Sequence, residues 1–301
     1  MNKLFSILKK EFLDNLDVRQ GSKELYSRIL KLFAEWVVNS GRNIKELKRA
    51  DIIEYKSYLI RTGKTENTID SYLSTIRSFY EYTELIGEHD NIAAGIKLKH
   101  KSKGYRKGHF SLDEIKKLYA SMSTDTLTDK RDYAIINLML RTGMRCIEVS
   151  RLRVCDINER NGKYDILIQR KGDEVRKERI GVSKKAMQPV IDYLNYRGVG
   201  DTKDPVFVTN CTIGELPMTA MRIGRIVKSY LIKSGIYSNM KTAHSLRHTA
   251  AVMAILNKVP IKEVQIMLGH KRIETTELYL KSIEDDLRLD NPAARALDNA
   301  F

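Results

Sequence analysis

The chain has 301 residues, of which 42% are hydrophobic and 30% are charged, and its formal net charge is +15. These proportions exclude a disordered chain, and the lack of a long apolar run in the sequence excludes one that crosses a bilayer by helices. A basic excess of this size predicts attraction to a polyanion, most often nucleic acid, although a merely soluble basic protein has a similar charge.

Two features bear on where the protein works. Charges are spaced through the first segment, MNKLFSILKKEFLDNL, which is typical of an amphipathic helix rather than a secretion signal. Three cysteines, Cys146, Cys155 and Cys211, are odd in number and lie in no metal-ligand spacing. We therefore expect reduced thiols and a cytoplasmic location.

Four amphipathic helices are predicted in the first part of the chain, because apolar residues recur there at three- and four-residue spacing. They cover residues 3–16, 22–40, 50–62 and 67–86, and a glycine follows each of the last three. Residues 1–96 are therefore expected to form a small helical bundle. Residues 1–108 carry 21 basic and 14 acidic side chains, a net charge of +7, which suits a DNA-gripping module; a pure interaction domain remains open.

A basic linker is predicted over residues 97–108, which contain no acidic residue and show no apolar periodicity. Its basic side chains are candidate DNA contacts: Lys97, Lys99, Lys101, Lys103, Arg106 and Lys107.

A second domain is predicted over residues 109–283, and its first helix start can be argued residue by residue. In FSLDEI, Ser111 is the expected N-cap, Glu114 completes a capping box, and Phe110 and Ile115 can form a hydrophobic staple. A helix over residues 130–141 is expected to end at Gly143.

Strand-like runs follow this helix: CDIN, KYDILIQ and RKERIGV, separated by the turns ERNG and RKGDEV. Helices are expected to return from Lys184 onward. The predicted fold class is therefore mainly α with a small β-sheet (α+β), an N-terminal helical bundle being followed by a mixed domain.

Four places in the second domain hold polar residues that suit a functional site: Arg145 and Glu148 in TGMRCIEV, Lys171 in a hairpin turn, His244, Arg247 and His248 in HSLRH, and His270 in LGH, nine residues before Tyr279. Each has a structural alternative, namely a surface ion pair, a solvated turn residue, a helix cap or a core aromatic residue. The two histidines of HSLRH have the i, i+4 spacing of a zinc site. No third ligand and no metalloprotease glutamate accompany them, so no metal is expected.

Together these motifs resemble the tyrosine recombinase family, also called the lambda-integrase family. The matching stretches are TGMRCIE, the lysine in a hairpin turn, HSLRHTAA and LGHKRIETTELY, and the resemblance spans the whole chain. The family needs two arginines, a lysine, two histidines and a tyrosine nucleophile, which the resemblance places, in the family's order, at Arg145, Lys171, His244, Arg247, His270 and Tyr279. The layout is closest to Xer-like proteins and compact phage or transposon integrases.

This set of side chains suits attack on a phosphodiester. Guanidinium groups bind the nonbridging phosphate oxygens through paired hydrogen bonds, and a phosphotyrosyl ester stores the cleaved bond without metal or ATP. Histidines can transfer protons near neutral pH, and Lys171 is suited to protonate the departing 5′ oxygen. Glu148 and His248 are expected to position the catalytic side chains without touching the phosphate, Glu148 by holding Arg145.

The resemblance implies a site-specific DNA recombinase, working through a 3′-phosphotyrosyl intermediate in integration, excision or resolution, without a cofactor, at the nucleoid of a prokaryote. The implied partners are double-stranded DNA with paired inverted half-sites and other copies of the chain, two on a site and four in a synaptic complex, with room for accessory proteins. Residues 284–301, with five acids against two arginines, are expected to dock on a neighbouring subunit rather than on DNA. A catalytically silent DNA-binding regulator and a type IB topoisomerase-like enzyme are the alternatives on the same fold.

Overall fold

The computed structural model describes residues 3–97, 108–209, 216–281 and 283–284. The chain divides into two compact units, Met1–Ser102 and Lys103–Phe301, and each is described by itself. Among the described residues, no helix is both long and apolar enough to span a bilayer.

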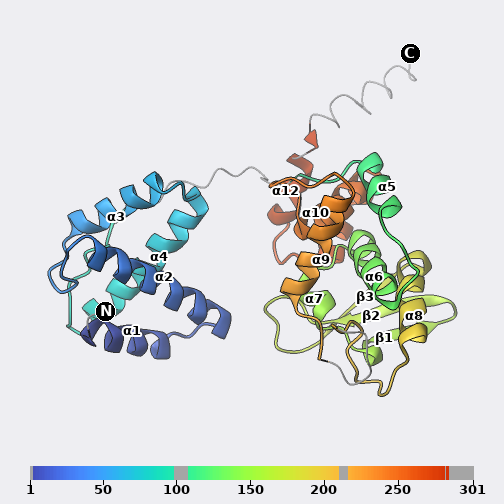
Figure 1. Ribbon diagram of the computed structural model, residues 1–301, viewed down its shortest axis with the longest axis horizontal. Coiled ribbons are helices and arrows are strands. Elements are labelled where there is room, and N and C mark those ends of the chain that lie inside the picture. The colour runs from blue at the N-terminus through green and yellow to red at the C-terminus, as the bar shows by residue number, and fades with distance from the viewer. Residues whose placement is uncertain (1–2, 98–107, 210–215, 282, 285–301) are drawn as a thin grey trace, which may run out of the picture. The chain divides into compact units, whose positions relative to one another are not determined.

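The first unit contains α1 (Lys3–Asn15), α2 (Gln20–Asn39), α3 (Arg49–Arg61) and α4 (Glu66–Leu85), blue to cyan in Figure 1. The four predicted helices are confirmed, with ends that differ by one or two residues. The last three end alike, at Gly41, Gly63 and Gly87, whose φ angles of 69°, 70° and 72° are left-handed. After α2, for example, the N–H of Gly41 donates to Val38 O, and the next N–H reaches one residue further back. This is the helix-ending geometry that glycine adopts without a steric cost from Cβ.

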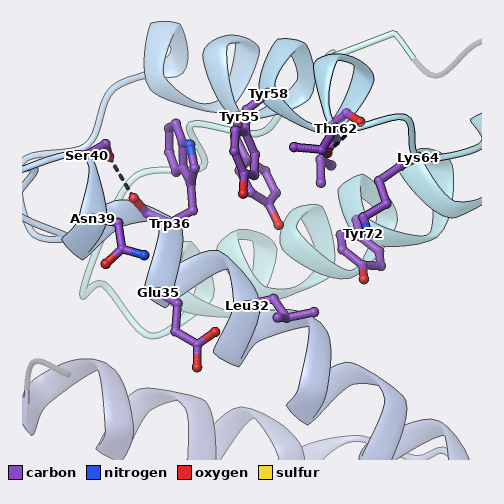
Figure 2. A pocket seen from close by; sticks show the side chains of 11 residues that line it. Leu32, Glu35, Trp36, Asn39, Ser40, Tyr55, Tyr58, Thr62, Lys64 and Tyr72 are labelled. Carbon is purple, nitrogen blue, oxygen red and sulfur yellow. Dashed lines mark hydrogen bonds between the residues drawn. The ribbon is translucent and has the colours of Figure 1, made fainter.

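The core of the first unit is largely aromatic. The Phe33 and Trp36 rings of α2 each lie with their centroids 5.0 Å from that of Tyr55 on α3. Beside this cluster lies a pocket of about 450 Å³, into which Trp36, Tyr55 and Tyr58 project from α2 and α3 and Tyr72 from α4 (Figure 2). The apolar faces of the predicted amphipathic helices therefore pack together through aromatic side chains.

The second unit opens with α5 (Leu112–Ala120), whose predicted capping box is confirmed. Ser111 Oγ accepts a hydrogen bond from the N–H of Glu114, and the Glu114 carboxylate accepts one from the N–H of Ser111. Helix α6 (Leu127–Thr142) begins three residues earlier than predicted, because Thr126 and Asp129 form a second capping box. Its predicted end at a left-handed glycine is confirmed.

The second unit also contains an antiparallel sheet of β1 (Ile157–Arg160), β2 (Lys163–Ile168) and β3 (Glu178–Val182), in the order β1-β2-β3. The prediction of a strand over CDIN is wrong at its start, since Val154–Asp156 is a 3-10 helix. The predicted turn ERNG is also too long. Only Asn161 and Gly162 form it, because their φ angles of 53° and 73° close a two-residue hairpin and leave Arg160 paired with Lys163.

One face of the sheet is covered by helix α8 (Lys184–Arg197), as Figure 1 shows. Ile166 of β2 lies opposite Ile180 of β3, and both side chains are buried in the core of the unit. Because alternate strand residues face the same side, Ile168 and then Arg170 follow Ile166 toward the interior.

The remaining helices are α9 (Ala220–Lys233), α10 (Ala243–Leu256), α11 (Ile261–Leu268) and α12 (Glu274–Lys281). Helix α10 contacts α6, α9, α11 and α12, so its residues are buried from Ser245 to Val252. The HSLRH motif therefore starts a central helix, and the predicted fold class, mainly α with one small sheet, is confirmed.

Candidate active site

Arg145, the first arginine of the predicted site, lies directly after the turn that ends α6. Gly143 terminates that helix, and Arg145 is the N-cap of the short helix α7 (Cys146–Ser150). The fully buried Glu148 carboxylate accepts hydrogen bonds from Arg145 N–H and Arg145 Nη1, both at 2.8 Å. The Arg145 side chain is 25% exposed. Glu148 is therefore in contact with Arg145 at two points, and a group entering from solvent can still reach the guanidinium.

The second arginine, Arg247 on α10, is only 1% exposed. Its Nη1 donates to Gly143 O at 2.7 Å, and its Nη2 donates to Leu268 O at 2.6 Å. Burial, chiefly, and the charge of Arg145 lower the pKa of Arg247 to about 10, so it remains cationic at neutral pH. One buried cation thus joins the turn before Arg145 to the end of α11.

His270 follows Gly269, the left-handed residue that ends α11. Its Nε2 lies 2.9 Å from Arg247 Nη2, and its Nδ1 lies 2.9 Å from Thr276 Oγ1 on α12. A guanidinium group can only donate, so Nε2 is the acceptor and the proton of the neutral ring is on Nδ1, facing Thr276. Burial first, and then the charge of Arg247, lower the pKa of His270 to about 3, which agrees with a neutral imidazole.

Tyr279 lies on α12 and is 2% exposed. Its ring centroid is 4.9 Å from that of His248 and 5.9 Å from that of His270. It also belongs to a buried apolar cluster with Ala251, Val264 and Leu268. Tyr279 is therefore a core aromatic residue, which was the structural alternative. It also lies beside two of the histidines of the polar motifs.

The two histidines of HSLRH have different surroundings. His244, in the first turn of α10, is exposed, and its charge contributes to the lowered pKa of His270. His248 is 1% exposed, and its ring centroid lies 4.9 Å from that of Tyr279 and 5.5 Å from that of His109. The described part of the chain contains no group of three or more His, Cys, Asp or Glu residues that could hold a metal ion.

Lys171 is exposed in the turn between β2 and β3, as the sequence predicted. An open cavity of about 580 Å³ is lined by Lys171 together with Arg145 and His270. Three segments that are far apart in the sequence therefore meet at one surface, and the buried Arg247 and Tyr279 do not line it.

Two residues of this region were missed by the sequence interpretation. Thr276, which is fully buried, fixes the ring of His270, and its position three residues before Tyr279, on the same helix face, was the available signal. Arg170 is 7% exposed and also lines the cavity. It continues the inward alternation of Ile166 and Ile168, and an arginine at an inward position indicates a buried ion pair.

The candidate DNA contacts of the linker are mostly not placed. Lys97 is exposed at the end of the first unit. Lys99, Lys101, Lys103, Arg106 and Lys107 lie outside the described residues, as do residues 285–301 of the predicted docking tail.

Both units of the chain are similar to known protein families. Residues 109–285 match the phage integrase family, and residues 10–85 match the phage integrase N-terminal SAM-like domain. The tyrosine recombinase XerD of Listeria monocytogenes serotype 4b is 28% identical over 285 residues, covering 90% of this chain and 93% of that protein.

Two solved structures share the fold. The crystal structure of XerH site-specific recombinase bound to palindromic difH substrate has a TM-score of 0.75 at 22% identity, covering 96% of this chain and 84% of that one. The lambda integrase tetramer bound to a Holliday junction has a TM-score of 0.71 at 15% identity, covering 92% and 76%. The family match covers more than half of the chain, so the chain belongs to the phage integrase family and is a site-specific DNA recombinase of the tyrosine type.

Proposed function

We propose that the protein cleaves and rejoins DNA by attack of Tyr279 on a phosphodiester, through a 3′-phosphotyrosyl intermediate. The observation that carries this proposal is the position of Arg247, which binds both the turn before Arg145 and the histidine stacked on Tyr279. A phosphate in the adjoining cavity would have both Arg145 and Lys171 among the residues that line it.

The two arginines divide the work on the phosphate. Arg145 is partly exposed and oriented by a buried carboxylate, so its free N–H groups suit the nonbridging oxygens. Arg247 is buried and stays charged, so it stabilises negative charge that builds up nearby without being solvated by water. Both are fixed before DNA arrives, which spares the reaction the cost of reorganising them.

His270 contributes chiefly by holding Arg247, because its Nε2 accepts a hydrogen bond from that guanidinium in the DNA-free protein. His244 is exposed at the start of α10 and is the histidine suited to hydrogen-bond a phosphate oxygen or move a proton there. Lys171 protonates the 5′ oxygen as it leaves, since an alkoxide departs slowly without a proton.

The surroundings of Tyr279 link cleavage to assembly. A hydroxyl on a residue that is 2% exposed needs α12 to shift before it meets a phosphate. The tail from residue 284 follows α12 closely, so its docking on a neighbouring subunit would supply that shift and would make four protomers on two paired sites the active species.

Ending the chain before Asn291 should preserve binding to one half-site and abolish strand exchange. Normal exchange by the truncated protein would contradict the role of the tail.

The basic linker is assigned to the DNA backbone. Neutralising Lys99, Lys101 and Lys103 together should weaken binding to all sequences alike, and should flatten the salt dependence by roughly one unit of slope per lost phosphate contact. Gel shifts at several salt concentrations measure this. An unchanged slope would mean that the linker only connects the two units.

Strand exchange separates this function from the alternatives. Two duplexes carrying the site, which we expect in the DNA that flanks the gene, are mixed with the protein in EDTA without ATP, one duplex being labelled. A recombinase joins labelled to unlabelled strands. A type IB topoisomerase-like enzyme relaxes supercoils without exchanging strands, and a silent regulator binds without a covalent adduct; either result would overturn the proposal.

A further inference from the structure

Arg170 is a buried guanidinium in the catalytic unit that no step above uses. It directly precedes Lys171 at the start of the turn between β2 and β3, and its side chain is 8% exposed whereas Lys171 is exposed. Burying a guanidinium is costly unless carboxylates and carbonyls compensate its charge, so its contacts indicate what it is placed to hold.

The first set of contacts closes the base of the turn. Arg170 Nε donates to Glu178 Oε2 at 2.9 Å, and Nη2 donates to Oε1 of the same carboxylate. Glu178 is the first residue of β3, so a two-point ion pair fixes the strands on both sides of the segment 171–177.

The second set of contacts fixes the turn to the segment that carries His270. Nη2 of Arg170 also donates to Met267 O at 3.2 Å, at the end of α11. The guanidinium lies against Gly269, where a Cβ would come within 2.5 Å of Arg170 Cζ. The glycine that positions His270 is thus also the residue that admits this arginine.

A third contact reaches Arg145 indirectly. Arg170 Nη1 lies 3.6 Å from Glu148 Oε2, and the other oxygen of that carboxylate accepts from Arg145. Nη1 has no hydrogen-bond acceptor among the described residues. One side chain therefore joins the hairpin to the two other segments that line the cavity.

We propose that Arg170 is a positioning residue that sets where Lys171 stands relative to the scissile phosphate. Lys171 lies in an exposed turn and has a long, flexible side chain, so its backbone has to be fixed by its neighbours. The adjacent Arg170 is bound at two points to β3 and at two carbonyl oxygens, those of Ile266 and Met267, to α11. A displacement of about 1 Å in such a group can cost roughly 10²-fold in rate.

The inference rests on the proposed function in that Lys171 is taken as the proton donor. The main competing role is direct: Arg170 Nη1 would bind a nonbridging oxygen of the phosphate itself. The two roles differ in their dependence on Lys171. A positioning residue loses its effect once Lys171 is gone, whereas a phosphate ligand does not.

The test compares cleavage rates of Arg170→Ala, Lys171→Ala and the double variant on a nicked duplex, with DNA binding and thermal unfolding measured alongside. We expect Arg170→Ala to slow cleavage by about 10²-fold, and the double variant to be no slower than Lys171→Ala. If the two single effects multiply in the double variant, or if Arg170→Ala cleaves normally, the inference is overturned.

A second substrate, with sulfur in place of the bridging 5′ oxygen, tests separately whether Lys171 donates the proton, since a thiolate leaves without one. If Lys171→Ala cleaves the sulfur substrate at a near-normal rate, Lys171 acts as the acid. If it does not, Lys171 is not the acid, and the comparison of the single and double variants still decides whether Arg170 acts through Lys171. Where Lys171→Ala is rescued, Arg170→Ala should be rescued as well. Impairment of Arg170→Ala on both substrates would then identify a phosphate ligand or a fold defect.

Two further variants serve as controls. Arg179→Ala is the matched one: Arg179 directly follows Glu178 on β3, is exposed, pairs with Asp165 and does not line the cavity, so its loss should leave the ratio of the cleavage rates on the oxygen and sulfur substrates unchanged. Should Arg170→Ala fail to fold, Glu178→Ala removes its two-point partner and should give the same dependence on Lys171 with a smaller effect. A multiplicative effect with Lys171→Ala would overturn the inference there too.

Discussion

The two units of the protein bury different chemistry. The interior of the first unit is built from apolar and aromatic side chains, and the buried polar residues of its described part are Asp70, Thr75 and Thr83. Among the described residues, the first unit thus buries one charged side chain, Asp70, whereas the second buries several, among them Glu148, Arg170 and Arg247. A buried charge costs several kcal/mol unless it is paired, whereas a buried ring stabilises by its area. We therefore expect the interior of the first unit to serve mainly its stability, and the buried cations of the second to serve the proposed phosphate site as well.

This difference leads to a sharp expectation. Substitutions in the first unit should change stability and leave the chemistry of bound DNA alone. Substitutions among the buried polar residues of the second unit should change both, because the same contacts hold the fold and the site.

The largest effect is expected at Arg247. Arg247→Ala leaves Gly143 O and Leu268 O without their donor, which should cost about 3 kcal/mol of unfolding free energy and at least about 10³-fold in cleavage rate. Denaturant unfolding and a single-turnover cleavage assay measure the two losses. Arg179→Ala, at an exposed position of β3, is the control that should cleave normally. An Arg247→Ala protein that cleaved at half the normal rate would place the phosphate elsewhere.

Thr276 should come next. Thr276→Val keeps the shape of the side chain but removes the acceptor for the Nδ1 proton of His270, which then has no fixed tautomer. Cleavage should slow by roughly tenfold to a hundredfold, the effect of one unmet buried hydrogen bond. Thr276→Ser retains the hydroxyl and should recover most of the rate. Equal loss in the two variants would mean that packing, not the hydrogen bond, matters at this position.

The protonation of His270 gives a smaller, pH-dependent effect. Its pKa in the folded, DNA-free protein is about 3, below the unfolded value of about 6.5, so the unfolded chain takes up the proton first as pH falls. The resulting stability is present in full above pH 6.5 and is lost as pH falls from 6.5 toward 3. Melting temperatures from pH 7 to 5 should therefore drop more for the wild type than for His270→Gln. An NMR titration midpoint of His270 near 6.5 would contradict the neutral, Arg247-bound ring.

The smallest effect is expected in the first unit. Gly63 has a φ of 70°, and a Cβ added there would have open space for 4 Å around it, so Gly63→Ala costs only the backbone strain, about 1 kcal/mol. Unfolding of the full chain should register this loss. The cleavage rate at saturating protein should not change, and a changed rate would break the division between the two units.

The sequence predicted most of the first unit and part of the second. Glycines after periodic helices located the ends of α2, α3 and α4, because those signals are local. The grouping of Arg145, Arg247 and His270 followed from resemblance to a family. Local patterns carry no trace of the bond from Arg247 to Gly143 O, which joins residues 104 positions apart. The burial of Tyr279 was one of the alternatives that the sequence offered, whereas the partners of Thr276 and Arg170 depend on tertiary packing, and the sequence signals at these two positions do not name them.

Mapping the covalent bond to DNA tests the central claim most directly. The protein is mixed in EDTA with a nicked duplex that carries its site, so that the cleaved strand diffuses away and the adduct accumulates. After proteolysis, mass spectrometry should find the nucleotide on the peptide that contains Tyr279, and Tyr279→Phe should bind the duplex without forming an adduct. An adduct on another residue, or one that persists in Tyr279→Phe, would contradict the assignment of the nucleophile and of the site built around it.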